Sequence, residues 1–129
     1  MRRVIQRDEF DCGVACVAMI RECNYEFAKR VFRKTNFSKR GSYPRDLTQA
    51  LKRLHVDCRG KFVSFEGRPA KRLLTRIGKN AIVKVKTPGS QGKWHWIVWD
   101  ANGARWLDPE EKSKDRYKRP RCISYLEIG

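Results

Sequence analysis

The sequence predicts an α+β domain in which helices come first and a mostly antiparallel sheet follows. Up to Leu54, apolar residues recur at helical spacing, which indicates amphipathic helices. From Val56 onward, short apolar runs separated by turn residues indicate strands instead. The chain has 129 residues, 40% of them hydrophobic, so we expect one domain with its own core and no internal repeat or linker.

Three helices are expected in the first half of the chain. Asp11 is the expected N-cap of a helix that begins at Cys12, and a second, short helix is expected over residues 25–33. After a polar loop, Pro44 begins the third helix, the clearest of the three, with Asp46 in its first turn. The first helix is expected to bury one face, formed by Ala15, Cys16, Met19, Ile20 and Cys23. The third is expected to bury Leu47, Ala50, Leu51 and Leu54.

Strands dominate the second half. They are expected over residues 55–65 with a bend at Gly60, over 81–87, over 94–100, over 105–108 and, as an edge strand, over 122–128. A short helix or turn at 70–77 is expected to end at Gly78. Asn102 and Gly103 predict a hairpin turn, residues 88–93 a glycine-bearing turn, and 110–121 a basic, polar segment.

Composition and charge narrow the function classes. The chain carries 30 Lys and Arg against 14 Asp and Glu, and a net charge of +16 is typical of proteins that bind nucleic acid or anionic membranes. Its apolar content excludes a disordered polycation, and no apolar run approaches the roughly 20 residues of a membrane-spanning helix. Because the first residues lack the apolar region of a signal peptide, we expect a cytoplasmic protein.

The five cysteines are expected to be reduced thiols. Their odd number does not suit a secreted disulfide scaffold. No pair has Cys-x-x-Cys spacing, and the two histidines, His55 and His95, are far apart in the sequence. The sequence therefore predicts neither a structural metal nor a cofactor.

One cysteine and one histidine stand where chemistry is expected. Cys12 lies at a helix N-terminus, where the helix dipole and the free backbone amides favour a thiolate. His95 lies in one strand of the expected hairpin and Asp108 in its return strand, so the carboxylate can orient the imidazole toward Cys12. Gln6 can supply a side-chain amide to an oxyanion hole, together with the backbone N–H of Cys12.

The run QRDEFDCGVACVAMI, which begins at Gln6, resembles the cysteine motif of bacteriocin-processing peptidases. These are the papain-like domains that precede peptide-exporting ABC transporters and cut leader peptides after a double glycine. The later HWIVWD and LDP resemble the histidine motif and the Asp-Pro of the same family. The resemblance implies one standalone papain-like domain over residues 1–129. It also implies a role for each matching residue: nucleophile Cys12, general base His95, orienting Asp108, oxyanion-binding Gln6, closely packed Gly13 and structural Cys16.

Two function hypotheses follow from these observations. The first is a papain-like cysteine peptidase that cleaves a peptide or protein bond through an acyl-enzyme, with a leader peptide or a host or phage protein as substrate. The alternative is a non-catalytic basic module of the same fold that engages nucleic acid or an acidic protein partner.

Overall fold

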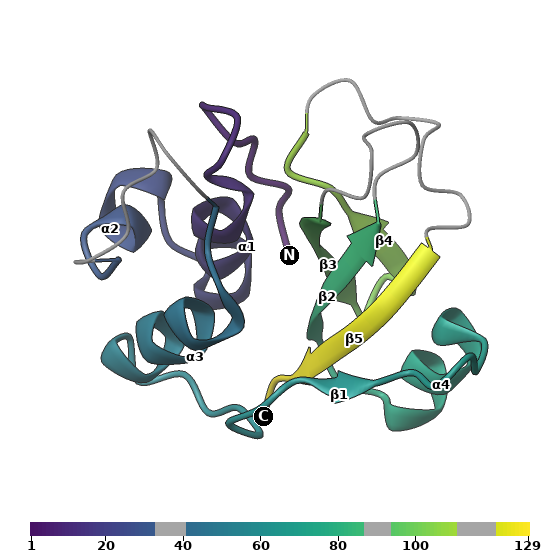
Figure 1. Ribbon diagram of the computed structural model, residues 1–129. Coiled ribbons are helices and arrows are strands. Elements are labelled where there is room, and N and C mark those ends of the chain that lie inside the picture. Colours follow the sequence, from purple (N-terminus) through teal and green to yellow (C-terminus); the bar gives the residue numbers. More distant parts are fainter. Residues whose placement is uncertain (33–40, 87–93, 111–120) are drawn as a thin grey trace.

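The computed structural model describes residues 1–32, 41–86, 94–110 and 121–129, and it confirms an α+β fold with a helical half beside a sheet (Figure 1). The helices are α1 (Cys12–Arg21), α2 (Tyr25–Lys29), α3 (Pro44–Arg53) and α4 (Ala70–Ile77). The strands are β1 (Val63–Ser64), β2 (Ala81–Lys86), β3 (Trp94–Asp100), β4 (Arg105–Leu107) and β5 (Arg121–Glu127). The expected turn at 88–93 and most of the expected loop and basic segments, at 35–40 and 111–120, lie outside the described residues.

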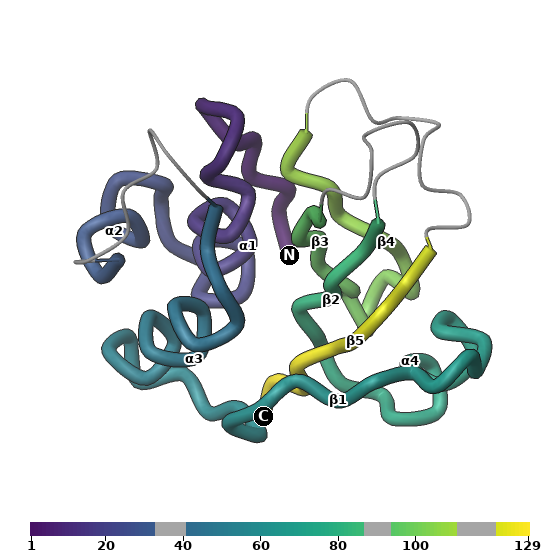
Figure 2. Tube along the Cα trace, viewed as in Figure 1, coloured from purple at the N-terminus to yellow at the C-terminus, as the bar shows by residue number. Residues whose placement is uncertain are grey.

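Helix α1 is the central helix of the molecule. It contacts β3, α2 and α3, and the chain trace shows it between α2 and the sheet, with α3 beside it (Figure 2). Every residue from Cys12 to Met19 is buried, so the expectation of a single buried face was wrong. Ile20 and Cys23, which were expected on that face, are only partly buried. The small residues of this helix allow neighbours to approach it from all sides.

Asp11 occupies the N-cap position of α1, but its side chain does not cap the helix. Its backbone carbonyl accepts the hydrogen bonds of the first turn, whereas its buried carboxylate accepts the N–H groups of Arg7 and Asp8 at 3.0 and 2.9 Å and the hydroxyl of Tyr25. The expected side-chain cap was therefore wrong. The carboxylate instead folds the preceding turn and fixes α2 against the start of α1.

Helices α2, α3 and α4 follow the expected signals with one change in length. The side chain of Asn24 accepts the N–H of Phe27 and caps α2, which ends at Lys29 rather than at residue 33. Helix α3 begins at Pro44 as expected and buries Leu47, Ala50 and Leu51. Helix α4 ends at Gly78, which has a positive φ of 72° and provides the left-handed C-cap.

The sheet is antiparallel with strand order β1-β5-β2-β3-β4. Strand β5 pairs with both β1 and β2, so the expectation of an edge strand near the C-terminus was wrong. The long strand expected over residues 55–65 is reduced to β1 and an isolated bridge between Cys58 and Ile128. Gly60, with a φ of 82°, turns the chain between these two pairings.

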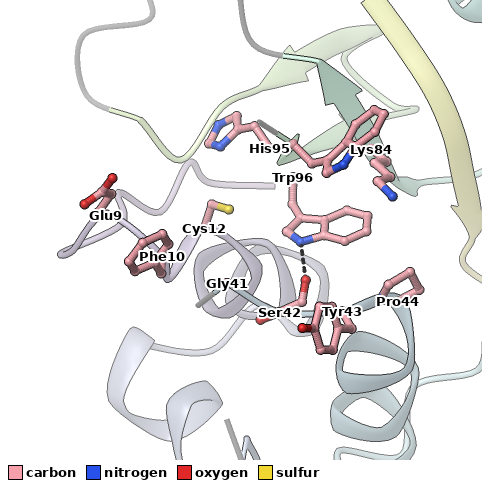
Figure 3. A pocket seen from close by; sticks show the side chains of 11 residues that line it. Glu9, Phe10, Cys12, Gly41, Ser42, Tyr43, Pro44, Lys84, His95 and Trp96 are labelled. Atoms are coloured by element: carbon pink, nitrogen blue, oxygen red, sulfur yellow. Dashed lines mark hydrogen bonds between the residues drawn. The ribbon is translucent and has the colours of Figure 1, made fainter. Parts of the chain in front are cut away.

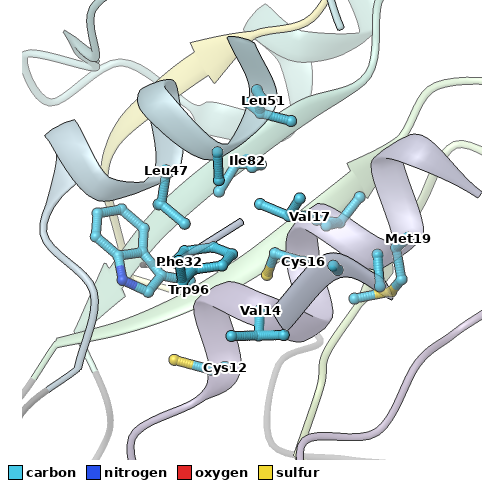
Figure 4. Packing of buried hydrophobic residues seen from close by; sticks show 14 of the residues in the cluster. Cys12, Val14, Cys16, Val17, Met19, Phe32, Leu47, Leu51, Ile82 and Trp96 are labelled. Atoms are coloured by element: carbon cyan, nitrogen blue, oxygen red, sulfur yellow. The ribbon is translucent and has the colours of Figure 1, made fainter. Parts of the chain in front are cut away.

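The two faces of the sheet have separate cores. Ile82 and Trp96 point toward α1 and α3, where they pack with residues such as Val17 and Leu51 (Figure 4). The alternate residues of the same strands, such as Val83, pack with α4 on the opposite face. None of the helices described is long and apolar enough to cross a membrane.

Candidate active site

Cys12 is the first residue of α1 and lies at the junction of the helical half and the sheet. It is 6% exposed and lines a pocket. The first turn of α1 contains no acidic residue. The backbone N–H groups of such a turn lack acceptors within the helix, and they favour a negative charge at this position.

His95 and Asp108 form a buried pair beside Cys12. Nε2 of His95 lies 2.8 Å from Oδ1 of Asp108, and each residue is 6% exposed. Strand β4 pairs with β3 only from Val98 to Asp100, so the chain leaves the ladder after Leu107. Asp108 can therefore reach the beginning of β3, where His95 stands.

Other parts of the chain hold Asp108 in position. The backbone N–H of Glu110 donates to Oδ1 at 2.8 Å, and the guanidinium of Arg3 donates to the backbone carbonyl of Asp108 at 2.6 Å. Oδ2 is buried and accepts no hydrogen bond from the described residues. The contact with Glu110 orients the carboxylate toward the imidazole, and the contact with Arg3 holds the backbone of Asp108 in place. The sequence did not indicate this function of Arg3 and Glu110.

The surroundings of His95 favour its charged form. Burial alone lowers the pKa of its imidazole, but hydrogen bonds that the ring donates to the side chains of Asp108 and Cys12, together with the attraction of both groups, outweigh burial and raise this pKa to about 10. The neighbours of His95 therefore favour its imidazolium form. Since Nε2 faces Asp108, Nδ1 is the ring nitrogen that remains for the thiol of Cys12.

Cys16 stands one helical turn after Cys12 and differs from it in environment. It is fully buried in the core between α1 and the sheet. Burial, and then the nearby Cys12 and Asp108, raise the pKa of the Cys16 thiol well above its usual value. Cys16 is therefore a neutral packing residue, and all five cysteines of the chain are free thiols.

Figure 3 shows the pocket that contains both Cys12 and His95. It has a volume of about 390 Å³, and its walls come from the turn before α1, the segment before α3, and strands β2 and β3. The indole N–H of Trp96 donates to the carbonyl of Ser42 at 3.0 Å and joins the two sides of the pocket floor. Trp94 and Trp96 of β3 line the same pocket, and the sequence contained no signal for Ser42 or for Lys84 from β2.

Gln6 lies in the segment that leads to α1. Its backbone N–H donates to the carbonyl of Pro109 at 2.8 Å, which fixes this segment beside the Asp108 turn. Its side-chain nitrogen Nε2 donates one hydrogen to the carbonyl of Asp8 at 2.8 Å, and Oε1 is buried with no partner among the described residues. The structure thus places Gln6 next to the His95–Asp108 pair, although Gln6 does not line the pocket.

One group of residues here has spacing suited to a metal ion. Ligand atoms of His95, Asp108 and Glu110 lie within 4.8 Å of one another, and no other such group occurs in the part of the chain that the structure describes. The direct hydrogen bond between Nε2 of His95 and Oδ1 of Asp108 is sufficient to explain why these ligand atoms lie close together, so their spacing does not require an ion.

Comparison with known proteins assigns no family: no protein-family model and no curated protein matches the chain.

Proposed function

We propose that this protein is a papain-like cysteine peptidase with Cys12 as nucleophile, His95 as general base and acid, and Asp108 as the residue that orients His95. The observation that carries the proposal is the buried 2.8 Å contact between His95 and Asp108. The same imidazole is hydrogen-bonded to Cys12, which is the first residue of helix α1. A nucleophile, a base and an orienting carboxylate in this order constitute a hydrolytic triad.

The charge states support the chemistry. In the proposed mechanism the sulfur of Cys12 passes its proton to the imidazole of His95 and attacks from the N-terminal end of α1. The thiolate attacks the carbonyl carbon of the substrate and forms a tetrahedral oxyanion. The backbone N–H of Cys12 and the second Nε2 hydrogen of Gln6 are the donors proposed to stabilise this oxyanion.

Two proton transfers complete the reaction. As the C–N bond breaks, the imidazolium of His95 gives its proton to the leaving amine, and the acyl group stays on Cys12 as a thioester. The neutral imidazole then takes a proton from water, which attacks the thioester. Release of the acid regenerates the thiolate and the imidazolium. The cysteine must be reduced throughout, which suits a cytoplasmic setting.

Thiol reactivity and peptide cleavage test the proposal together. Iodoacetamide at neutral pH should modify Cys12 before the other four cysteines, and tryptic mass spectrometry reads the site directly. Cys12→Ala should abolish cleavage of a proteome-derived peptide library, whereas the control Cys23→Ala, which changes a half-buried thiol outside the pocket, should retain it. An unreactive Cys12, or cleavage by Cys12→Ala, would show that the mechanism is wrong.

A second candidate function is supported by helix α4. Its exposed side carries Lys71, Arg72 and Arg76, and the helix contains no acidic residue. It packs on the sheet face opposite α1 and α3, and so it can contact a polyanion independently of the pocket. A triple substitution of these residues by Gln should reduce the salt dependence of binding to duplex DNA by a slope of about 3 if this surface binds nucleic acid.

A further inference from the structure

Lys84 is an unexpected charge in the candidate active-site pocket. It lies on β2, the middle strand of the sheet, and is half-buried. Its ammonium stands 4.4 Å from the ring centroid of Trp94 and 5.9 Å from that of Trp96. Side chains alternate along a strand, so Lys84 points to the same face as Ile82, toward the helices, and lines the pocket with Cys12.

The charge of Lys84 is not neutralised within the described structure. No carboxylate of the described residues forms an ion pair with it, and among those residues its ammonium contacts the indoles of Trp94 and Trp96. A cation over a ring face retains N–H donors that point elsewhere, because an ammonium has three. A half-buried ammonium with apolar walls therefore offers an anion a strong and directional partner.

Ser42 adds a second polar group to the same pocket. Its hydroxyl oxygen is buried and has no hydrogen-bond partner among the described residues, and the residue as a whole is 6% exposed. A buried hydroxyl without a partner is costly, and it is commonly satisfied by a ligand or by water. The hydroxyl oxygen lies against α1, since a Cβ added at Gly13 would come within 2.6 Å of it, so Lys84 is the donor that the pocket offers to a ligand.

The pocket is also asymmetric. In Figure 3, Glu9 and Phe10 lie at one end and Lys84 lies at the other, with Cys12 between them. A negative group on a bound substrate is attracted to the Lys84 end and repelled at the Glu9 end. The charge distribution therefore favours one side of the cleaved bond for an acidic group.

We propose that this pocket selects substrates that carry a carboxylate within a few residues of the cleaved bond, bound by the ammonium of Lys84. The inference rests on the proposed peptidase function and names its substrate class. The carboxylate belongs either to an Asp or Glu side chain or to the C-terminus of the substrate. The net charge of +16 adds a long-range attraction for such substrates.

The test compares cleavage of matched peptides. Cleavage sites are first mapped by mass spectrometry with the wild type on a proteome-derived peptide library. Peptides around the preferred sites are then made in pairs that differ only in Glu against Gln, Asp against Asn, or a free against an amidated C-terminus. The readout is the ratio of kcat/KM within each pair, which separates the two sources of carboxylate.

Lys84→Met and Lys86→Met are the matched variants. Both remove one positive charge from a half-buried position of β2, but only Lys84 lines the pocket. The wild type and Lys86→Met should prefer the acidic peptide of a pair by about tenfold, whereas Lys84→Met should reduce this ratio to about one. Lys84→Arg should retain the preference. Equal ratios in the wild type, or an unchanged preference in Lys84→Met, would overturn the inference.

A binding measurement separates this inference from the peptidase proposal. If the wild type cleaves nothing, the proposed function has failed, and labelled peptides chosen without cleavage data, paired as Glu against Gln or as a free against an amidated C-terminus, are titrated against wild type and Lys84→Met by fluorescence anisotropy. Tighter binding of acidic peptides that depends on Lys84 would then still support a carboxylate site. Binding that is absent, or equally strong for both peptides of a pair, would refute it.

Discussion

Substitution of Gly13 by Ala tests how closely the structure packs behind Cys12. An added Cβ would lie 2.6 Å from Oγ of Ser42, 3.0 Å from Cβ of Ser42 and 3.0 Å from Cδ2 of Leu47. Ordinary contacts between nonbonded carbons are about 3.5–4.0 Å. Ser42 cannot retreat freely, because its carbonyl accepts the indole N–H of Trp96, and Leu47 is fully buried.

The expected cost follows from two opposing effects. Overpacking of a filled core costs about 1–3 kcal/mol, whereas replacing Gly by Ala inside a helix gains up to about 1 kcal/mol. Because three atoms must move, we expect Gly13→Ala to lower the free energy of unfolding by about 1–2 kcal/mol. For a domain of this size each kcal/mol corresponds to roughly 3–6 °C in Tm. Urea unfolding followed by circular dichroism measures the free energy, and thermal unfolding followed by the same signal measures Tm.

A double-mutant cycle with Ser42→Ala identifies the contact responsible. Ser42→Ala alone removes a buried hydroxyl without a partner and should be neutral or stabilising by about 1 kcal/mol. In that background Gly13→Ala should cost at least about 0.5 kcal/mol less, since the nearest contact is gone. A stabilising Gly13→Ala, or strictly additive effects, would refute this account of the packing behind Cys12.

Three further predictions concern the buried charges and the core. The pKa of His95 is raised to about 10, so its contribution to stability is complete below the unfolded value of about 6.5 and should be lost as the pH rises from there through 10. NMR titration of the imidazole measures the pKa, and urea unfolding at several pH values measures the loss of stability. Asp108→Asn should make this dependence on pH weaker. Asp11→Ala removes a fully buried carboxylate that accepts three hydrogen bonds, and it leaves the Tyr25 hydroxyl without its partner. The free energy of unfolding in urea should fall by about 3 kcal/mol, and a fall below about 1 kcal/mol would contradict this. Leu51→Ala, in the fully buried face of α3, should cost about 2–5 kcal/mol with no change in m-value.

The elements with strong local signals could be predicted from the sequence. Pro44 with Asp46 determines where α3 begins, Gly78 ends α4, and the turn between β3 and β4 lies around Asn102 as expected. Each signal acts through backbone geometry or a hydrogen bond within a few residues, so no knowledge of the rest of the fold is needed.

The errors concern features that depend on distant neighbours. Whether β5 is an edge strand is decided by β1, which pairs with it from a part of the chain far away in sequence. In the same way, α1 is buried on all sides because α2, α3 and β3 surround it, and its own sequence shows only small apolar residues. Hydrophobic periodicity identifies one buried face of a helix, and so it underestimates the burial of a helix that packs against several neighbours.

The candidate site shows the same division. Cys12 at a helix start and His95 and Asp108 on one hairpin are local features, and the structure brings them together. The sequence contained no such signal for Lys84 and Ser42. A lysine in a strand and a serine in a loop are common, and only the fold shows that these two line the pocket.

The difference between locally determined groups and groups placed by the whole fold has a consequence for function. The reacting groups can be held by short-range geometry, because a hairpin and a helix terminus fix them within a few ångströms. Selectivity instead depends on what the assembled halves enclose, and here they enclose an ammonium between two indoles. Substitutions at Lys84 should therefore change which peptides are cleaved while the His95–Asp108 pair remains intact. Substitutions at Asp108 should slow the cleavage of all of them alike.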